Sequence, residues 1–278
     1  MIKRIAVPID FSEYSEYALE VASKIAKLLD GELIVVHLLG MDKVHLPDSE
    51  SALVYDNELH LKLVKNKFKE FLKKPWLKNI KLTHFIQNYK NFTELNAIAE
   101  DFICDLIVMG SHGNTGFKNT FVGSNTEKIV RTSRIPVLVI KNREKDFKIE
   151  KVVFASDFSR DYLPAFKKLL EWLRPFDAEL QLLHVNTSEN FMRRTEIEEK
   201  IFKFLLQAEI EDISLYDKVA YYDDDSIEEG IFSYSYKYEA DIITIPTHGR
   251  RGLAHFFIKS LGEDLMNHSE TPVLTIKI

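Results

Sequence analysis

The chain has 278 residues, of which 45% are hydrophobic and 29% are charged, and its formal net charge is −6. This length predicts two domains near the common size of about 100–150 residues each. No apolar run is long enough for a transmembrane helix, and the N-terminus lacks the pattern of a secretory signal. The negative charge argues against nucleic acid as the main ligand. We therefore expect a soluble cytoplasmic protein with no membrane or nucleic-acid partner.

The charge is divided unevenly along the chain. From residue 149 onward there are 24 acidic and 15 basic residues, whereas the residues before it include 19 acidic and 22 basic ones. A polyanionic ligand is therefore expected to prefer the first part of the chain.

The single cysteine excludes an intramolecular disulfide. Cys104 lies in the apolar run FICDLIVMG, a setting typical of a small buried hydrophobic side chain. We expect it to pack in a core and to have no nucleophilic role.

The first part of the chain alternates between apolar strands and amphipathic helices. Ser12 is placed to cap the first helix, and Gly31 is placed where that helix is expected to end in a left-handed residue. The expected elements, in chain order, are a strand at 4–11, a helix ending near 29, a strand at 33–39, a polar segment at 40–58, a helix at 59–74, a strand at 80–87, a helix at 94–102, a strand at 105–110, a loop at 110–123, a helix at 124–133 and a strand at 137–141. Such alternation predicts an α/β fold with a doubly wound, parallel, five-stranded sheet.

The second part of the chain repeats the first. Residues 109–141 align without a gap on 245–277 with 12 identities in 33 positions, where chance gives roughly two. Earlier in the chain, Asp157 matches Asp10 and His184 matches His37. The charged segment 141–150 is the expected boundary, which gives domains at 1–144 and 149–278, here called half one and half two. We expect the halves to pair within the chain, and a homodimer remains open.

The candidate site of half one combines three strand ends with one glycine-rich loop. In an open parallel sheet, ligands bind beyond the carboxyl ends of the strands, at the point where the strand order reverses. Glycines let the loop backbone approach a ligand, and the helix that follows offers free N–H groups to phosphate. The candidate binding residues are Pro8, Ile9, Asp10, Leu38, Met109, Gly110, Gly113, Gly123, Ser124 and Asn125.

Two of these residues also have simpler interpretations. Asp10 is placed either to hydrogen-bond an adenine edge or ribose, or to act only as a turn residue before the first helix. Ser124 is placed to donate its hydroxyl to phosphate, to cap the helix, or to do both.

The two copies differ in the loop. Gly110 corresponds to Pro246, which lacks an N–H and has a fixed φ, and Gly123 corresponds to Lys259, whose long side chain replaces an approachable backbone. We expect half two to be degenerate and mainly structural, with phosphate binding by Lys259 as the alternative.

The spacing Gly110-x2-Gly113-x9-Gly123-Ser124 resembles the nucleotide-binding signature of the universal stress protein (UspA) family. The segments VPIDFSEYSEYAL and SRIPVLVIK also resemble the opening and closing segments of that family. The resemblance covers the whole chain as a tandem two-domain member, and it implies an adenine-nucleotide α-hydrolase-like α/β sandwich in each half. It further implies bound ATP or ADP, with or without Mg²⁺. The adenine would lie near Asp10 and Leu38, and the phosphates along Gly113, Gly123 and Ser124.

Three functions follow from this reading. The first is an ATP-binding stress-response regulator that acts on an unknown protein partner. The second is a nucleotide-free scaffold, and the third is a slow ATPase or adenylate-transferring enzyme. The chain contains none of the phosphate-loop, dinucleotide-fingerprint, nucleophile-elbow or zinc-protease motifs, so we expect no catalytic residue and no metal site. His112 and His248 occupy matched positions, for which a loop-stabilising hydrogen bond is the favoured role.

Overall fold

The computed structural model describes residues 2–39, 57–88, 93–112, 123–210, 214–247 and 270–278. Half one contains β1 (Arg4–Ile9), α1 (Glu13–Leu29), β2 (Glu32–Leu39), α2 (Asn57–Phe71), the 3-10 helix η2 (Pro75–Leu77), β3 (Lys81–Asn88), α3 (Glu94–Asp101), β4 (Leu106–Gly110), α4 (Ser124–Thr132) and β5 (Val137–Ile140). Half two contains β6 (Lys151–Ala155), the 3-10 helix η3 (Arg160–Tyr162), α5 (Leu163–Leu173), β7 (Glu179–Asn186), α6 (Arg194–Gln207), α7 (Ser214–Asp217), β8 (Val219–Asp223), α8 (Ile227–Tyr238), β9 (Ile242–Thr247) and β10 (Val273–Lys277).

The described strands form one ten-stranded sheet with the order β3-β2-β1-β4-β5-β10-β9-β6-β7-β8. Each half contributes five strands in the same order, and all pairs within a half are parallel. The predicted parallel five-stranded halves are confirmed. What the sequence pattern did not predict is that the two sheets are continuous.

The strands are apolar because helices cover both faces of the sheet. Along β1, Ile5 and Val7 belong to the core under α1, α2, α5 and α6, whereas Ala6 belongs to the core under α3, α4 and α8. Successive strand side chains point to opposite faces, so a strand covered on both sides has no solvated face and reads as a continuous apolar run.

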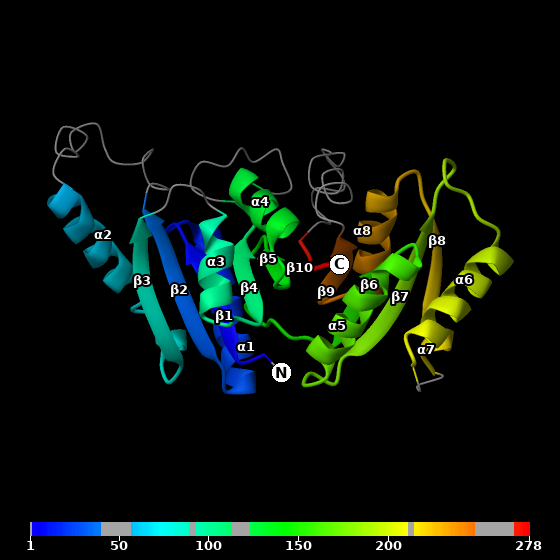
Figure 1. The fold of residues 1–278 in the computed structure, drawn as a ribbon, viewed down its shortest axis with the longest axis horizontal. Helices are drawn as coiled ribbons and strands as arrows, with labels where there is room; N and C mark the ends of the chain where they lie inside the picture. The colour runs from blue at the N-terminus through cyan, green and yellow to red at the C-terminus, as the bar shows by residue number, and fades with distance from the viewer. Residues whose placement is uncertain (1, 40–56, 89–92, 113–122, 211–213, 248–269) are drawn as a thin grey trace.

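The two halves meet at β5 and β10, which pair antiparallel in the middle of the molecule (Figure 1). Leu138 pairs with Leu274, its own counterpart in the repeat, and both side chains are fully buried. The interface between the halves is therefore self-complementary, like a two-fold interface, although it is made within one chain. This pairing confirms the expectation that the halves associate intramolecularly.

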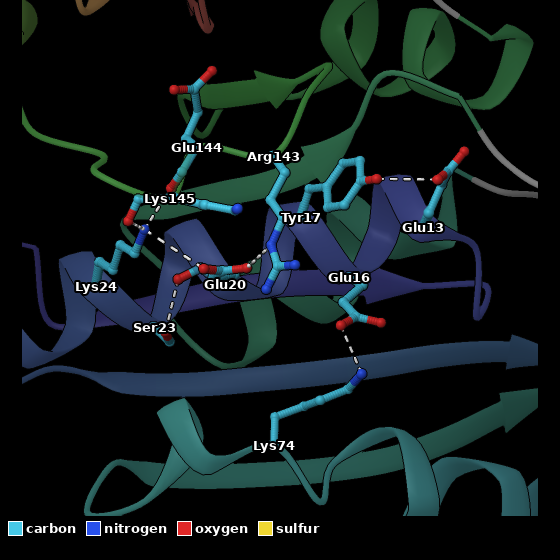
Figure 2. Close-up of polar contacts among 10 residues, drawn as sticks. All are labelled: Glu13, Glu16, Tyr17, Glu20, Ser23, Lys24, Lys74, Arg143, Glu144 and Lys145. Atoms are coloured by element: carbon cyan, nitrogen blue, oxygen red, sulfur yellow. Dashed lines mark hydrogen bonds and ion pairs between the residues drawn. The ribbon is translucent and has the colours of Figure 1, made fainter.

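The segment between the halves is held against α1. Arg143 Nε donates to the Glu20 carboxylate over 3.0 Å, and Lys24 Nζ donates to the backbone carbonyls of Glu144 and Lys145 (Figure 2). The side chain of Glu20 is only 10% exposed, whereas that of Arg143 is 47% exposed, so water reaches this ion pair from the arginine side only. The charged segment that the sequence marks as a boundary is thus anchored to half one.

The end of α1 differs from the sequence expectation. Asp30, with φ 49° and ψ 42°, is the left-handed residue that ends the helix, and its N–H bonds to the carbonyl of Ala26. Gly31 follows this turn and does not form it. Aspartate tolerates the left-handed region better than most residues with a side chain, which explains why the glycine is not needed there.

Cys104 has the buried environment expected from its sequence. It is 7% exposed, and burial with the neighbouring negative charge of Asp105 raises the pKa of its thiol to about 12. Since the thiolate is the reactive form, we expect the folded protein to resist a disulfide reagent at about pH 8, while the unfolded chain reacts with one equivalent. Stoichiometric labelling of the folded protein as rapid as that of the unfolded chain would contradict this assignment.

Candidate functional site

The carboxyl ends of β1 and β4 form the centre of the candidate site. These strands are neighbours in the sheet. The helix that follows β1, α1, covers one face of the sheet, whereas the helix that precedes β4, α3, covers the other face. This is the reversal point at which open parallel sheets bind ligands. Four of the predicted site residues line the strand ends and are buried, namely Pro8, Ile9, Leu38 and Met109.

The turn after β1 is stabilised by its own polar side chains. Asp10 is 5% exposed, and its Oδ1 accepts hydrogen bonds from the N–H and hydroxyl of Ser12 over 3.0 and 2.5 Å. Ser12 in turn caps α1, as predicted, by accepting from the N–H of Ser15. Phe11, between them, has a φ of 63°, a rare conformation for a bulky residue. Asp10 therefore stabilises the turn before α1, which fixes its carboxylate at the strand edge, and its role toward a ligand stays a prediction.

Gly110 is required by the close approach of α1. A Cβ built on Gly110 would lie 2.7 Å from the carbonyl carbon of Tyr14 and 2.8 Å from its oxygen and its Cβ. From the sequence, this glycine was expected to let the backbone turn tightly or approach a ligand. The contact with the first turn of α1 supplies a packing reason as well.

The helix α4 begins beside the end of β4. The N–H of Gly123 donates to the carbonyl of Ser111 over 2.7 Å, and the Thr126 hydroxyl donates to the carbonyl of Gly110 over 2.8 Å. Gly123 is the N-cap, with φ −71° and ψ 157°, so the expectation that Ser124 caps the helix is wrong. Ser124 is the first helical residue, because the extended backbone that a cap requires occurs one residue earlier.

Glycine at the N-cap has a chemical consequence. It has no side-chain acceptor for the N–H groups of the first turn of α4, which include those of Ser124 and Asn125. These donors and the positive end of the helix dipole lie next to the reversal point, where an anion would be stabilised. Gly113 lies outside the described residues.

Two histidines stabilise the edges of this site. His37 is fully buried, with Nδ1 2.8 Å from the carbonyl oxygen of Ile9, so it links β2 to β1. His112 Nδ1 lies 3.1 Å from the Ser111 hydroxyl, in agreement with the loop-stabilising role predicted for it. Sequence reasoning missed Thr126 and Ser111, whose contacts position α4. The Thr126 hydroxyl has no counterpart in the repeat, where Gly262 stands, and that difference was a usable signal.

The equivalent region of half two contains a cavity of about 280 Å³. It is lined by residues from the ends of β6, β7 and β9, among them Ser156, His184 and Pro246. Lys259, Ser260 and His248 lie outside the described residues. The expectation that half two is mainly structural stays a prediction.

His184 is expected to make stability depend on pH. Burial, with the positive charge of Lys200, lowers its pKa below the ordinary 6.5. In the unfolded chain His184 takes up a proton near pH 6.5, whereas in the folded chain it does so only at a lower pH. The free energy of unfolding should therefore fall as the pH decreases from 6.5 through the folded-state pKa. In denaturant titrations, His184→Gln should decrease this slope relative to the unmodified chain. Parallel slopes for the two proteins would contradict the prediction.

Among the residues that the structure describes, no group of three or more His, Cys, Asp or Glu side chains is arranged to hold a metal ion. Within the same residues, no helix combines the length and apolarity needed to cross a membrane.

The fold and the strand-end geometry define a class of tandem α/β protein with one potential ligand edge in each half. A model of the universal stress protein family matches residues 1–141 and 148–277, and the chain belongs to this family. The universal stress protein MJ0577 of Methanocaldococcus jannaschii is 34% identical over 157 residues, which cover 51% of this chain and 97% of that protein.

Solved structures share the whole tandem fold. A universal stress protein from Archaeoglobus fulgidus superposes with a TM-score of 0.63 at 20% identity, covering 99% of this chain and 96% of that one. The protein PA1789 from Pseudomonas aeruginosa superposes with a TM-score of 0.62 at 17% identity, covering 99% and 92% of the two chains. At these identities the likeness concerns the fold.

Proposed function

We propose that this universal stress protein binds ATP or ADP in half one and that the bound nucleotide controls its association with a protein partner in the cytoplasm. The observation that carries the proposal is the N-terminus of α4, which has a glycine N-cap and is joined to the end of β4 through Gly123, Ser111 and Thr126. Such a helix end, fixed at the reversal point of a parallel sheet, favours a phosphate group.

The phosphates are assigned to the backbone of Gly113 and Gly123 and to Ser124 and Asn125. The adenine and ribose are assigned to the strand edge formed by Pro8, Ile9, Asp10, Leu38, Met109 and Gly110. The excess of basic residues in half one, against the acidic excess in half two, also favours an anionic ligand in half one. Mg²⁺ would be held by the nucleotide phosphates, since the described residues offer no cluster of ligands for it.

Asp10 and its counterpart Asp157 provide a matched test. Both accept a hydrogen bond from the backbone N–H two residues later, over 3.0 and 2.8 Å, and asparagine preserves that acceptor. Loss of one charge-assisted hydrogen bond to nucleotide costs roughly 1.5–3 kcal/mol. Asp10→Asn should therefore weaken ATP binding by about 10- to 100-fold in calorimetric titrations with Mg-ATP, and Asp157→Asn should leave it unchanged. Equal effects of the two variants, or no binding by the unmodified chain, would overturn the proposal.

A further inference from the structure

The outer end of half one, where α2 lies beside β3, is strongly basic (Figure 1). Residues 61–81 contain eight lysines and one acidic residue. On α2, Lys62, Lys65 and Lys69 recur at the three- and four-residue spacing that places side chains on one face of a helix, and Lys73 continues the row just after the helix. All four lysines are exposed. This row is called the lysine face below.

The helix α2 is fixed on half one by its other side. Val64 and Phe68 are buried, and the Phe68 ring lies edge-on to the ring of Phe11 in the turn after β1, with the centroids 6.1 Å apart. Just beyond the helix, Lys74 Nζ donates to the Glu16 carboxylate of α1 over 2.6 Å (Figure 2). The lysine face is therefore carried by an anchored helix, which lowers the ordering cost of binding a partner.

Ion pairs within α2 do not explain the central lysines of this face. Neither Lys65 nor Lys69 has an acidic residue three or four positions away, and each has a lysine on both sides at that spacing instead. Like charges at this spacing destabilise a helix. The corresponding helix of half two, α6, has compensated charges, such as Arg194 paired with Glu198 over 2.9 Å. The repulsion present in only one of the two copies points to an anionic partner outside the chain.

The composition of the lysine face favours carboxylates over nucleic acid. Residues 61–81 include no arginine and no exposed phenylalanine, tyrosine or tryptophan. Nucleic-acid sites commonly use arginine forks on phosphate and aromatic rings that stack on bases. The net charge of −6 on the whole chain would also repel a polyphosphate backbone.

A membrane surface is disfavoured by the packing of α2. A helix that lies on a membrane inserts its apolar face into the lipid. The apolar side of α2 already packs in the core of half one, and among the described residues of this helix Leu63, at 46%, is the one large apolar side chain that is exposed. An acidic protein segment needs no such insertion, because its carboxylates can pair with the lysines along the helix.

We propose that the lysine face of α2 is the docking surface for an acidic segment of a partner protein, in which glutamate or aspartate recurs every three or four residues. Lys62, Lys65 and Lys69 pair with these carboxylates, and Leu63 adds an apolar contact beside them. The inference names the kind of partner that the proposed function leaves open, but the surface itself does not require bound nucleotide.

Fluorescence anisotropy with the full chain, without nucleotide and at low ionic strength, tests the proposal. The probe is a fluorescein-labelled helical peptide of about 20 residues, in which glutamate recurs every three or four positions around a single leucine. We expect this peptide to bind. The same peptide with glutamine in place of every glutamate should not bind, and added salt should weaken the binding of the acidic peptide.

Two triple variants remove the same charge at different places. The variant Lys62→Gln, Lys65→Gln, Lys69→Gln should bind the acidic peptide about tenfold more weakly, as expected for three exposed ion pairs. The control replaces three exposed lysines on other helices, Lys27→Gln, Lys167→Gln, Lys203→Gln, and should change the affinity less than about twofold. Both variants are first checked for a cooperative thermal transition. If the first does not fold, the double variant Lys65→Gln, Lys69→Gln takes its place.

The proposal is overturned if the acidic peptide does not bind, or if the two triple variants lose affinity equally, because net charge alone would then be responsible. Tighter binding of polyuridylate RNA or of phosphatidylserine vesicles than of the peptide, through the same lysines, would assign the face to another class of partner. Self-association of the unmodified chain in ultracentrifugation, abolished in the first variant, would assign it to a second copy. Failure of ATP to bind half one would leave all of these results unaffected.

Discussion

Replacing Gly110 with alanine is expected to lower the free energy of unfolding by about 1–3 kcal/mol, the typical cost of forcing extra atoms into a packed core. The added Cβ would lie 2.7–2.8 Å from the carbonyl carbon, the oxygen and the Cβ of Tyr14. Two of these atoms belong to the helix backbone, which cannot rotate away as a side chain can. Relief therefore requires α1 to move from the sheet, and the Asp10–Ser12 turn would move with it. Nucleotide affinity should decrease together with stability.

Urea denaturation of the full chain measures this effect, with Gly31→Ala as the control. A Cβ on Gly31 would lie 3.2 Å from the carbonyl oxygen of Lys3 and 3.6 Å from the next atoms, so only a small adjustment is needed there. We expect the denaturation midpoint of Gly110→Ala to fall clearly below that of Gly31→Ala. Equal midpoints for the two variants would show that α1 does not pack on β4 as described.

Replacing Gly123 with lysine is expected to remove ATP binding while the fold is retained. The backbone of Gly123, with φ −71° and ψ 157°, is open to any residue, so the substitution introduces no backbone strain. The side chain would project where phosphate is proposed to meet the first turn of α4. Loss of two charge-assisted hydrogen bonds, each worth roughly 1.5–3 kcal/mol, predicts a loss of affinity of about 100-fold or more.

The control for this variant is Ser188→Lys, which adds the same charge at an exposed position of half two. Titration with Mg-ATP should show nearly normal affinity for Ser188→Lys, and the two variants should have similar thermal transitions. If Gly123→Lys binds ATP as tightly as the unmodified chain, the phosphate position proposed at α4 is wrong.

The parallel halves could be predicted because their cause is local and periodic. Apolar runs such as LIVVHLL indicate strands buried on both faces, and the repeat of Pro-Val-Leu indicates a second copy. The continuous sheet could not be predicted in this way. The pairing of Leu138 with Leu274 joins residues far apart in the chain, and either edge strand could have faced solvent or another chain.

The candidate site could be predicted only as a set of strand ends. The position of Gly110 followed from its place after an apolar strand, but its contact with Tyr14 depends on how α1 crosses the sheet. The start of α4 at Ser124 was predicted, but its N-cap was displaced by one residue, because serine is usually the stronger capping residue and glycine occupied the extended position here. The cavity of half two lies at the ends of β6, β7 and β9, and no local pattern in the sequence specified it.

The most direct test of one nucleotide site per chain is the stoichiometry of bound ATP, measured by equilibrium dialysis of the full chain with radiolabelled ATP and Mg²⁺. We expect one ATP per chain, and none in Gly123→Lys at the same free concentration. Two ATP per chain would show that half two binds nucleotide despite Pro246 and Lys259. No bound ATP in the unmodified chain would contradict the proposed function and favour a nucleotide-free scaffold.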